Sequence, residues 1–510
     1  MVQKARKSWL MSLALVLLIG LTLAGCGSGG AGGGDPVAQP PQAEESKPSE
    51  AAAPQEKSGK GEPVELIWYM IGTPQKDTDK VFEELSKYTK EKINVTVKMK
   101  LLDWGDYDTK MPVIAASGEP FDIAFTCSWA FNYVNNSRKG AFLELNELLD
   151  QYGQGIKDAL HPAFLEGAKV DGKIYAVPTN KELPAQNVWR FNQQLLEKYD
   201  LDISGVKSLE SLEPLLKTIK EKEKGIVVYA GDKNIKPIIP FDLVDESLPV
   251  GMPLGGGEKL VNILETPEMM QAFETMHKYY NAGYMAKDIA TLTSSDHDKT
   301  GKWFADKANT APLADNLWSA SYGYKVVSTP ADDPLVYNWS VTGSMNAISA
   351  TSEHPVEAMK FLNLLNTDPY VRNMVGYGIE GVHYKKIGEN RIELLPASTE
   401  SYAVPGFALG NVMITYLQKD DPDNKWEEYE KFNNSAQNAP LLGFNFDPTP
   451  VQNEIAALRN VKEEFYPPIM TGTVDPTKAV PQAIEKFNAN GLAKVMEEMQ
   501  RQYDEWKAKQ

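Results

Sequence analysis

The spacing of apolar residues between positions 63 and 126 switches repeatedly between a period of two and a period of three to four. Apolar or alternating runs of strand length lie at residues 64–69, 93–99 and 121–126. The first interval between them predicts a helix, because Val81, Leu85 and Tyr88 form an apolar stripe. The second interval predicts a helix over residues 107–116. This order is typical of a mostly parallel sheet covered by helices.

A second region of alternating helices and strands is predicted after residue 180. Helices are expected at residues 193–198, 209–222 and 267–282, with a strand at 227–230. The third helix has its predicted buried face at Met269, Phe273, Met276 and Tyr280. A strand over 341–350 precedes a helix that begins at His354-Pro355 and carries Ala358, Phe361, Leu362 and Leu365. One last long helix is expected from about residue 480 to 507.

The N-terminus has the pattern of a secretion signal. Three basic residues precede the apolar stretch Leu10 to Ala24, which is shorter than the ~20 residues of a membrane span. The stretch ends in Leu23-Ala24-Gly25-Cys26, which resembles the lipobox of bacterial lipoproteins, where the cysteine thiol is acylated and the chain is cut just before it. We therefore expect a signal peptide at 1–25, lipid on Cys26 and a disordered tether at 26–62. The alternative is an uncleaved membrane anchor with a chance cysteine.

Composition narrows the range of partners. A chain of 510 residues predicts more than one lobe. Its formal charge of −17 becomes about −20 without the first 25 residues, which carry three basic groups and no acidic ones. Such a charge argues against nucleic acid and against anionic membrane surfaces as partners. With Cys26 acylated, Cys127 is left alone and no intramolecular disulfide is expected.

Aromatic residues lie at or near three predicted strand ends. Trp68-Tyr69, Asp103-Trp104 and Ser128-Trp129 follow the first three strands in turn. Open sheets with parallel strands bind ligands at the carboxyl ends of those strands. These residues therefore predict one edge of a ligand site, although aromatic side chains also fill cores.

Motifs for catalysis, cofactors and metals are weak. Residues 167–174 nearly fit a phosphate-binding loop, but Ile174 stands where Ser or Thr must be. The five histidines lack zinc spacing, and Asp296-His297-Asp298 fits a solvated loop better than a cation site. We expect no cofactor, no metal and no catalytic residue. A glycosidase needs two carboxylates flanking a bond, and among 69 acidic residues the sequence singles out no such pair.

Four stretches occur in an order that resembles a known family. They are Ala116–Ile123, Gly172–Pro178, Trp303–Ala311 with Asn316–Trp318, and Ala347–Ser349 with Ala358–Leu362. Together they resemble the extracellular solute-binding protein family 1, whose members feed ATP-binding-cassette (ABC) importers for sugars. The C-terminal Phe444–Pro450 is similar to the LipO-like subgroup, which has a DUF3502-like C-terminal region.

The resemblance implies an α/β fold of the periplasmic-binding-protein type II, with two lobes, a hinge of two or three crossings and a ligand cleft. Lobe one would comprise 63–178 and 341–395, and lobe two 185–335 and 400–510. It implies a monomeric lipoprotein on the extracytoplasmic face of a bacterial cell membrane, which captures a carbohydrate and delivers it to the membrane subunits of an ABC importer. The alternatives are a lipid-tethered carbohydrate-active enzyme and a peptide- or oligomer-binding lipoprotein without transport.

The candidate ligand-binding residues combine this resemblance with aromatic chemistry. An indole stacks on the apolar C–H face of a sugar, and polar side chains bind its hydroxyl rim. Trp318 is the strongest candidate because the resemblance places a tryptophan of that stretch in the cleft, and Asp315 or Asn316 would meet the hydroxyls. The full set is Trp68, Tyr69, Trp104, Ser128, Trp129, Asn316, Trp318, Trp339 and Glu380. Packing within or between lobes is the alternative for the aromatic residues, and a plain turn for Glu380.

Overall fold

The computed structural model describes residues 61–510. The signal peptide, the acylated Cys26 and all of the predicted tether up to residue 60 lie outside the described residues, so these predictions stay predictions. Within residues 61–510, no helix combines the length and the apolar character needed to cross a membrane.

The first sheet has five strands in the order β2-β1-β3-β15-β6. They are β1 (Val64–Ile71), β2 (Val95–Leu102), β3 (Ile123–Thr126), β6 (Ala176–Pro178) and β15 (Met345–Ile348). Four of them point the same way, and β15 alone runs opposite because it is antiparallel to both β3 and β6. The predicted mostly parallel sheet is thus confirmed, with the returning strand reversed.

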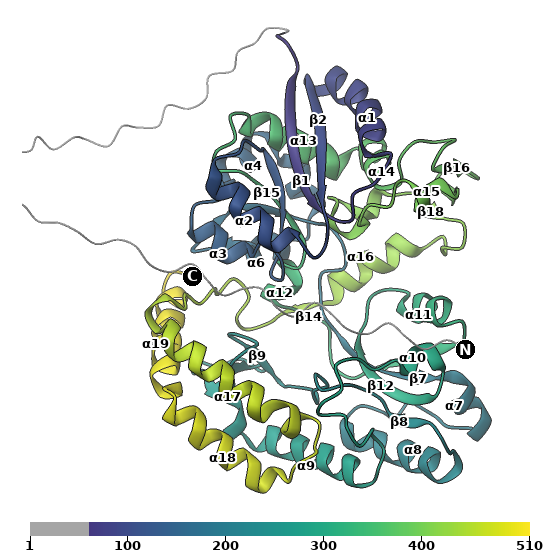
Figure 1. The fold of residues 1–510 in the computed structure, drawn as a ribbon, viewed down its shortest axis with the longest axis vertical. Helices are drawn as coiled ribbons and strands as arrows, with labels where there is room; N and C mark the ends of the chain where they lie inside the picture. Colours follow the sequence, from purple (N-terminus) through teal and green to yellow (C-terminus); the bar gives the residue numbers. More distant parts are fainter. Residues whose placement is uncertain (1–60) are drawn as a thin grey trace, which may run out of the picture. The chain divides into compact units, whose positions relative to one another are not determined.

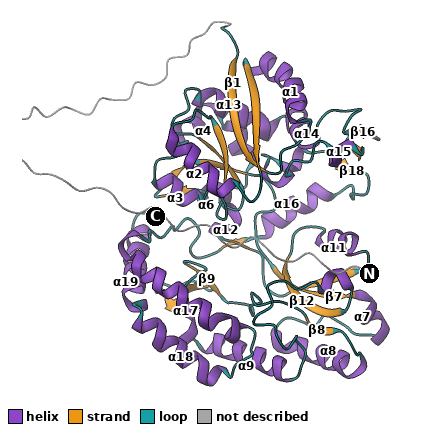
Figure 2. Cartoon of the chain, viewed as in Figure 1, coloured by secondary structure: helices purple, strands orange, loops and turns teal. Residues whose placement is uncertain are grey.

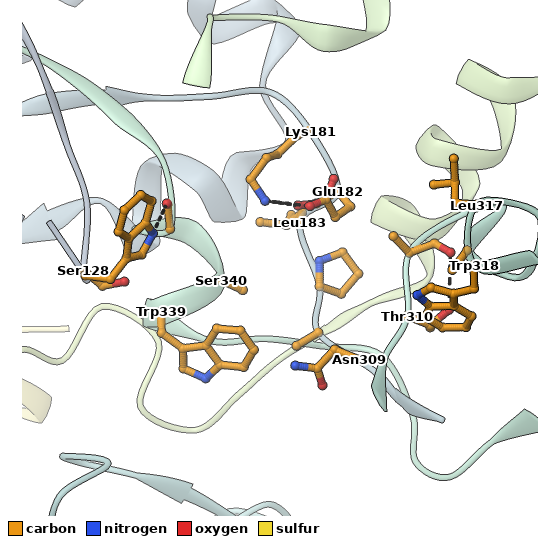
Figure 3. A pocket seen from close by; sticks show the side chains of 16 residues that line it. Ser128, Lys181, Glu182, Leu183, Asn309, Thr310, Leu317, Trp318, Trp339 and Ser340 are labelled. Atoms are coloured by element: carbon orange, nitrogen blue, oxygen red, sulfur yellow. Dashed lines mark hydrogen bonds and ion pairs between the residues drawn. The ribbon is translucent and has the colours of Figure 1, made fainter. Parts of the chain in front are cut away.

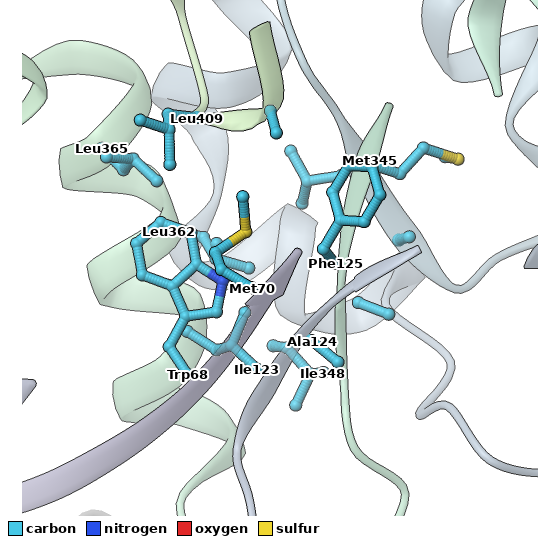
Figure 4. Close-up of a cluster of buried hydrophobic side chains, with 14 of the residues drawn as sticks. Trp68, Met70, Ile123, Ala124, Phe125, Met345, Ile348, Leu362, Leu365 and Leu409 are labelled. Carbon is cyan, nitrogen blue, oxygen red and sulfur yellow. The ribbon is translucent and has the colours of Figure 1, made fainter. Parts of the chain in front are cut away.

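Helices α1 (Thr78–Ile93), α2 (Tyr107–Ser117) and α13 (Pro355–Thr367) contribute buried side chains to the core of this sheet. Helix α14 (Pro369–Tyr377) packs against α1 and α13. Val81 and Leu85 of α1 are buried, as their spacing predicts. Figure 4 shows the core beneath, where the Trp68 ring lies among apolar side chains that include Leu362.

The second sheet has the order β13-β7-β12-β8. Its strands are β7 (Asn187–Asn192), β8 (Val227–Tyr229), β12 (Trp303–Asn309) and β13 (Val326–Pro330). Here β7 alone is reversed, since it is antiparallel to both of its neighbours. In each sheet, the reversed strand is the first strand of that sheet to follow a crossing from the other sheet: β7 follows β6, and β15 follows β13. Such a direct crossing differs from the helical crossover that joins parallel neighbours.

Helices α7 (Gln193–Tyr199), α8 (Leu209–Lys222) and α9 (Pro267–Asn281) lie close to their predicted positions. The prediction of Tyr280 as a buried residue of α9 is wrong. Tyr279 rather than Tyr280 is buried, and its ring meets those of Tyr229 and Tyr284. Both positions lie within one turn of Met276, so the spacing alone could not separate them.

Three long helices form the C-terminal part and lie side by side in Figure 1: α17 (Gln452–Met470), α18 (Pro476–Ala489) and α19 (Leu492–Lys507). The single helix predicted for 480–507 is therefore two helices. Gly491 separates them with a φ of +94°, a left-handed conformation that favours glycine, and a Cβ there would lie 2.9 Å from Cγ of Glu454. The strand predicted at 341–350 is likewise shorter, because α12 (Asn338–Val341) takes its first residue.

Shorter elements complete the chain (Figure 2). The helices are α3 (Tyr133–Arg138), α4 (Asn146–Tyr152), α5 (Gln154–Ala159), α6 (Pro162–Gly167), α10 (His297–Thr300), α11 (Ala314–Tyr322), α15 (Ala397–Glu400) and α16 (Lys425–Ser435), with 3-10 turns η1 (Ile263–Glu265), η2 (Gly406–Ala408), η3 (Val412–Ile414) and η4 (Thr449–Val451). The strands are β4 (Lys169–Val170), β5 (Lys173–Ile174), β9 (Phe241–Leu243), β10 (Val250–Pro253), β11 (Val261–Asn262), β14 (Leu335–Val336), β16 (Tyr384–Lys386), β17 (Arg391–Leu394), β18 (Leu417–Gln418) and β19 (Gln437–Asn438).

The buried side chains form separate cores around the two sheets and beneath the C-terminal helices. Tyr402, Ala408 and Leu409 pack into the core of the first sheet. The predicted boundaries give this short segment to lobe two, whereas its packing joins it to lobe one. The lobe boundaries as a whole stay a prediction.

Candidate ligand-binding cavity

A cavity of about 460 Å³ opens where loops from both sheets meet. Its walls come from the loop after β3, the crossing between β6 and β7, the end of β12 and helices α11 and α12. The lining residues are Ser128, Trp129, Lys181, Glu182, Leu183, Pro184, Ala185, Asn309, Thr310, Ala311, Ala314, Leu317, Trp318, Trp339, Ser340 and Gly343. Figure 3 shows Trp339 and Trp318 on opposite sides of the view, with Asn309 between them. We call this space the first cavity.

Trp318 is held in the cavity wall by a charged side chain behind it. It lies on α11, and Cζ of Arg190 is 4.7 Å from the centroid of its ring. The Arg190 guanidinium is itself fixed by two hydrogen bonds to the carboxylate of Asp306, at 2.9 and 2.6 Å. Such a cation–π contact in a desolvated setting orients the indole and leaves the rest of its surface for a ligand.

Trp129 reaches the cavity from the loop after β3. Its indole N–H donates to the carbonyl of Gly343 at 2.9 Å, yet the residue is 51% exposed. Trp104 stacks on it with 6.3 Å between the ring centroids and 14° between the planes, and Phe407 adds a third ring 6.5 Å from Trp129. These three side chains, which we call the aromatic cluster, continue the apolar surface beyond the first cavity.

Trp339 forms the third aromatic wall. It lies on α12 and stacks on Tyr337, with ring centroids 5.5 Å apart and planes 16° apart. Ser340 next to it donates to the Tyr337 carbonyl at 2.9 Å and accepts from the Tyr337 N–H at 3.1 Å, which fixes the turn. The indole is thus supported on one face and half exposed on the rest of its surface.

Polar groups lie between these aromatic walls. Lys181 donates to the carboxylate of Glu182 at 2.8 Å, and both side chains remain partly exposed. Asn309 is exposed at the end of β12, and the Thr310 hydroxyl donates to the Ala311 carbonyl at 3.3 Å. The first cavity therefore combines flat apolar surfaces with hydrogen-bonding groups of both kinds, which suits a ligand rich in hydroxyls.

The structure brings together four of the nine predicted residues: Ser128, Trp129, Trp318 and Trp339 all line the first cavity. Trp104 lies next to the cavity, in the aromatic cluster.

Trp68 and Tyr69 are corrections to the prediction, since both are buried in β1. The Trp68 indole donates to Asn346 at 3.1 Å, and the Tyr69 hydroxyl donates to Glu119 at 2.6 Å. The predicted strand ends at residue 69, but β1 continues to Ile71. The two aromatic residues therefore lie within the sheet rather than at its edge.

Two further predicted residues point elsewhere. Asn316 is exposed on α11 but does not line the first cavity. Glu380 is exposed and lies 3.9 Å from the Lys386 ammonium, also outside the cavity lining. Asp315 accepts hydrogen bonds from the N–H and the hydroxyl of Ser328 at 3.0 and 2.6 Å, so its carboxylate fastens α11 to β13.

Sequence reasoning missed the crossing residues 181–185 and Leu317, which line the cavity, and Phe407 beside it. The crossing directly follows Gly172–Pro178, which suggests a passage between lobes, and Leu317 lies inside Asn316–Trp318, so the sequence held a usable signal for both. Phe407 had none, because only the tertiary fold brings η2 to the loops after β2 and β3. Within residues 61–510, no group of three or more His, Cys, Asp or Glu side chains could hold a metal ion.

Comparison with known proteins gives one consistent result. The profile for bacterial extracellular solute-binding proteins matches residues 72–371, and a domain of unknown function, DUF3502, matches residues 440–508. A carbohydrate ABC transporter substrate-binding protein of Streptococcus pneumoniae is 37% identical over 453 residues, which are 88% of this chain and 91% of that protein. Lipoprotein LipO of Bacillus subtilis is 24% identical over 47% of this chain and 48% of its own length.

Solved structures agree on the fold. The N-glycan transport solute binding protein NgtS of Streptococcus pneumoniae matches with a TM-score of 0.80 at 37% identity, over 87% of this chain and 98% of that one. A structure of NgtS in complex with Man5GlcNAc matches with a TM-score of 0.66. The predicted two-lobe α/β fold and the predicted family are thereby confirmed. This chain belongs to the bacterial extracellular solute-binding protein family.

Proposed function

We propose that this chain captures an oligosaccharide in the first cavity and delivers it to an ABC importer. The observation that carries the proposal is the convergence of Trp129, Trp318 and Trp339 on one cavity. Each indole is supported by a defined contact, which lowers the entropy lost when a ligand stacks on it. The pneumococcal relatives named above, which carry carbohydrate and N-glycan in their names, support the same class of ligand.

The distribution of exposed apolar side chains supports this assignment. Nine large hydrophobic residues are exposed in the described part of the chain. Three of them, Trp129, Leu317 and Trp339, line the first cavity, and Trp104 and Phe407 contact Trp129. Exposed apolar surface gathered at one place marks a binding site rather than chance exposure.

The protein is proposed to bind the oligosaccharide without hydrolysing it. Glu182 is the single carboxylate among the residues that line the first cavity, and it is paired with Lys181 at 2.8 Å. Glycoside hydrolysis ordinarily needs two carboxyl groups facing each other across the bond. We expect the purified protein to leave oligosaccharides intact over hours, and product above a no-protein control would favour the enzyme alternative.

A thermal-shift screen of mono- and oligosaccharides tests ligand capture, because a ligand that binds only the folded state raises the melting temperature. Each sugar that raises the melting temperature is then titrated by calorimetry into the wild type, into Trp129→Ala and into the control variant Tyr370→Ala. Tyr370 is also an exposed aromatic residue, but its ring contacts that of Tyr88 and does not line the cavity. Loss of affinity in both variants, or no hit among the sugars, contradicts the proposal.

Membrane attachment through Cys26 and a monomeric state complete the proposal. A lipid-anchored monomer would hold its cavity close to an importer without spanning the membrane. Cys26→Ser should release the protein from the membrane fraction into the soluble fraction. If that variant stays membrane-bound, another anchor holds it.

A further inference from the structure

A second cavity of about 450 Å³ adjoins the first. The two share Ala185, Asn309 and Trp339, so a ligand that extends past Trp339 passes from one into the other. The second cavity is further lined by Asn187, Lys236, Pro237, Ile239, Phe241, Asp242, Leu243, Glu246, Lys307 and Tyr337. Its walls thus contain an aromatic pair and four charged side chains, whereas the first cavity contains one ion pair.

Within the described residues, Lys307 is the cation of the second cavity that has no carboxylate within ion-pairing distance, whereas Lys236 pairs with Glu246. It lies on β12 and is half-buried. Among the described residues, its ammonium has one hydrogen-bond acceptor, the Pro237 carbonyl at 3.4 Å, which is a long contact for a group with three donors. Burial lowers the pKa of Lys307 to about 8, so holding the charge at this position costs free energy.

The other charged groups around this lysine are already engaged. The Glu246 carboxylate pairs with Lys236 at 2.8 Å. Asp242 accepts the Leu441 N–H at 2.9 Å, and burial raises its pKa to about 7, so it carries only part of a negative charge near neutral pH. Asp332 accepts the Asn187 N–H at 2.7 Å. None of these carboxylates lies within ion-pairing distance of Lys307 in the described structure.

Tyr337 and Trp339 supply the apolar part of the second cavity. Their rings are stacked, and both line the cavity. A pyranose ring stacked on this pair would lie in the same cavity as Lys307, which lines it from β12. The arrangement combines a stacking surface with one unsatisfied cation.

We propose that the second cavity is a subsite for a carboxylate-bearing sugar unit, with Lys307 as its counter-ion and the Tyr337–Trp339 pair as its stacking surface. The inference rests on the proposed function and deepens it, because it assigns a chemical class to one unit of the oligosaccharide. A carboxylate on Lys307 replaces the lost hydration of the ammonium with a charge-assisted hydrogen bond.

Two matched pairs of probes separate charge from shape. One pair is trigalacturonic acid and its fully methyl-esterified form, and the other is a sialylated biantennary glycan and the same glycan with its sialic acid carboxylates methyl-esterified. We expect the acidic member of at least one pair to bind at least about 10-fold tighter, which corresponds to about 1.4 kcal/mol. Lys307→Met should reduce this preference to less than about 3-fold, and Lys307→Arg should keep most of it.

Lys173→Met is the matched control, because it removes the same charge from an exposed lysine that pairs with Glu144 outside both cavities. A folding check accompanies each variant. Lys307→Met removes a costly half-buried charge, so its melting temperature at pH 7 should equal or exceed that of the wild type.

Proton uptake provides a second readout. A carboxylate ligand raises the pKa of Lys307, so binding at pH 8.5 should take up a proton from solution. Calorimetry in two buffers of different ionisation enthalpy measures this uptake, which neutral probes and Lys307→Met should lack. The subsite is refuted if the neutral member of both pairs binds as tightly as the acidic one, or if the preference survives in Lys307→Met. Failure of every neutral and acidic oligosaccharide to bind refutes the proposed function together with the subsite.

Discussion

Arg190 on β7 and Trp318 on α11 form a cation–π contact, with the guanidinium carbon 4.7 Å from the indole centroid. The same guanidinium forms a bidentate ion pair with Asp306, and Nε2 of His297 lies 2.9 Å from Oδ2 of Asp306, the oxygen that also accepts from Nη2 of Arg190. The position of the aromatic wall of the first cavity therefore depends on a buried ion pair.

Arg190→Met should destabilise the fold and loosen Trp318 at once. The side chains of Arg190 and Asp306 are 10% and 5% exposed, so the substitution leaves a buried carboxylate without its main partner. We expect a loss of about 3–5 kcal/mol in the free energy of unfolding, measured by denaturant titration. The double variant with Asp306→Asn should recover part of this loss. A single-variant loss below about 1 kcal/mol would show that the pair does not hold the wall.

Trp318→Ala should weaken sugar binding more than folding. Removal of an aromatic anchor typically costs at least about 2 kcal/mol of binding free energy, or roughly 30-fold in affinity. Trp303→Ala is the contrasting variant, because that indole is buried in the core and its loss should cost about 3–5 kcal/mol of stability. Melting temperature and affinity are measured for both. A large drop in melting temperature with unchanged affinity in Trp318→Ala would assign this side chain to packing.

Trp104→Ala and Phe407→Ala should affect long ligands only. Both rings contact Trp129 but lie outside the lining of the first cavity. A short ligand confined to the cavity should bind the variants as it binds the wild type, whereas a longer one that reaches the aromatic cluster should lose a few-fold in affinity. Titration of a homologous series of increasing length measures the effect. Equal losses for all lengths would mean that the cluster acts by positioning Trp129.

Asp242 should make the protein less stable as the pH rises. Burial raises its pKa to about 7, above the value of about 3.9 in an unfolded chain. The folded state thus binds this proton more tightly, and the stability it confers is lost between about pH 4 and pH 7. Asp242→Asn keeps an acceptor for the Leu441 N–H and removes the titration. Its melting temperature should exceed that of the wild type at pH 8 and match it at pH 4; an equal difference at both pH values would contradict this.

Strands β1, β2 and β3 and helix α1 could be predicted from apolar periodicity, because their apolar residues recur at regular spacing, as Val81 and Leu85 show for α1. The site was harder to predict, since an aromatic residue looks the same in a sequence whether it ends a strand or lies inside it. Trp129 is available to a ligand because β3 ends at Thr126, before this residue. Trp68 is buried within the sheet because β1 continues to Ile71.

Lys307 shows the other limit of the sequence. Its residue type is common on surfaces, and its unusual feature is that no carboxylate of residues 61–510 lies within ion-pairing distance. That feature depends on Glu246 and Asp332 having other partners, and these contacts form between segments far apart in the chain. Motifs and periodicity depend on neighbours in the sequence, so they could not reveal that Lys307 lies away from the carboxylates around it.

The reversed strand β15 also determines the order in which the growing chain can complete its two sheets. It lies between β3 and β6, and no other strand in the described part of the chain joins these two. A chain synthesised as far as residue 330 already contains every strand of the second sheet, but it still lacks the strand that closes the first. The first sheet is therefore completed after the second, although its first strands are synthesised earlier. About 170 further residues must be synthesised after β6 before β15 can pair with β3 and β6.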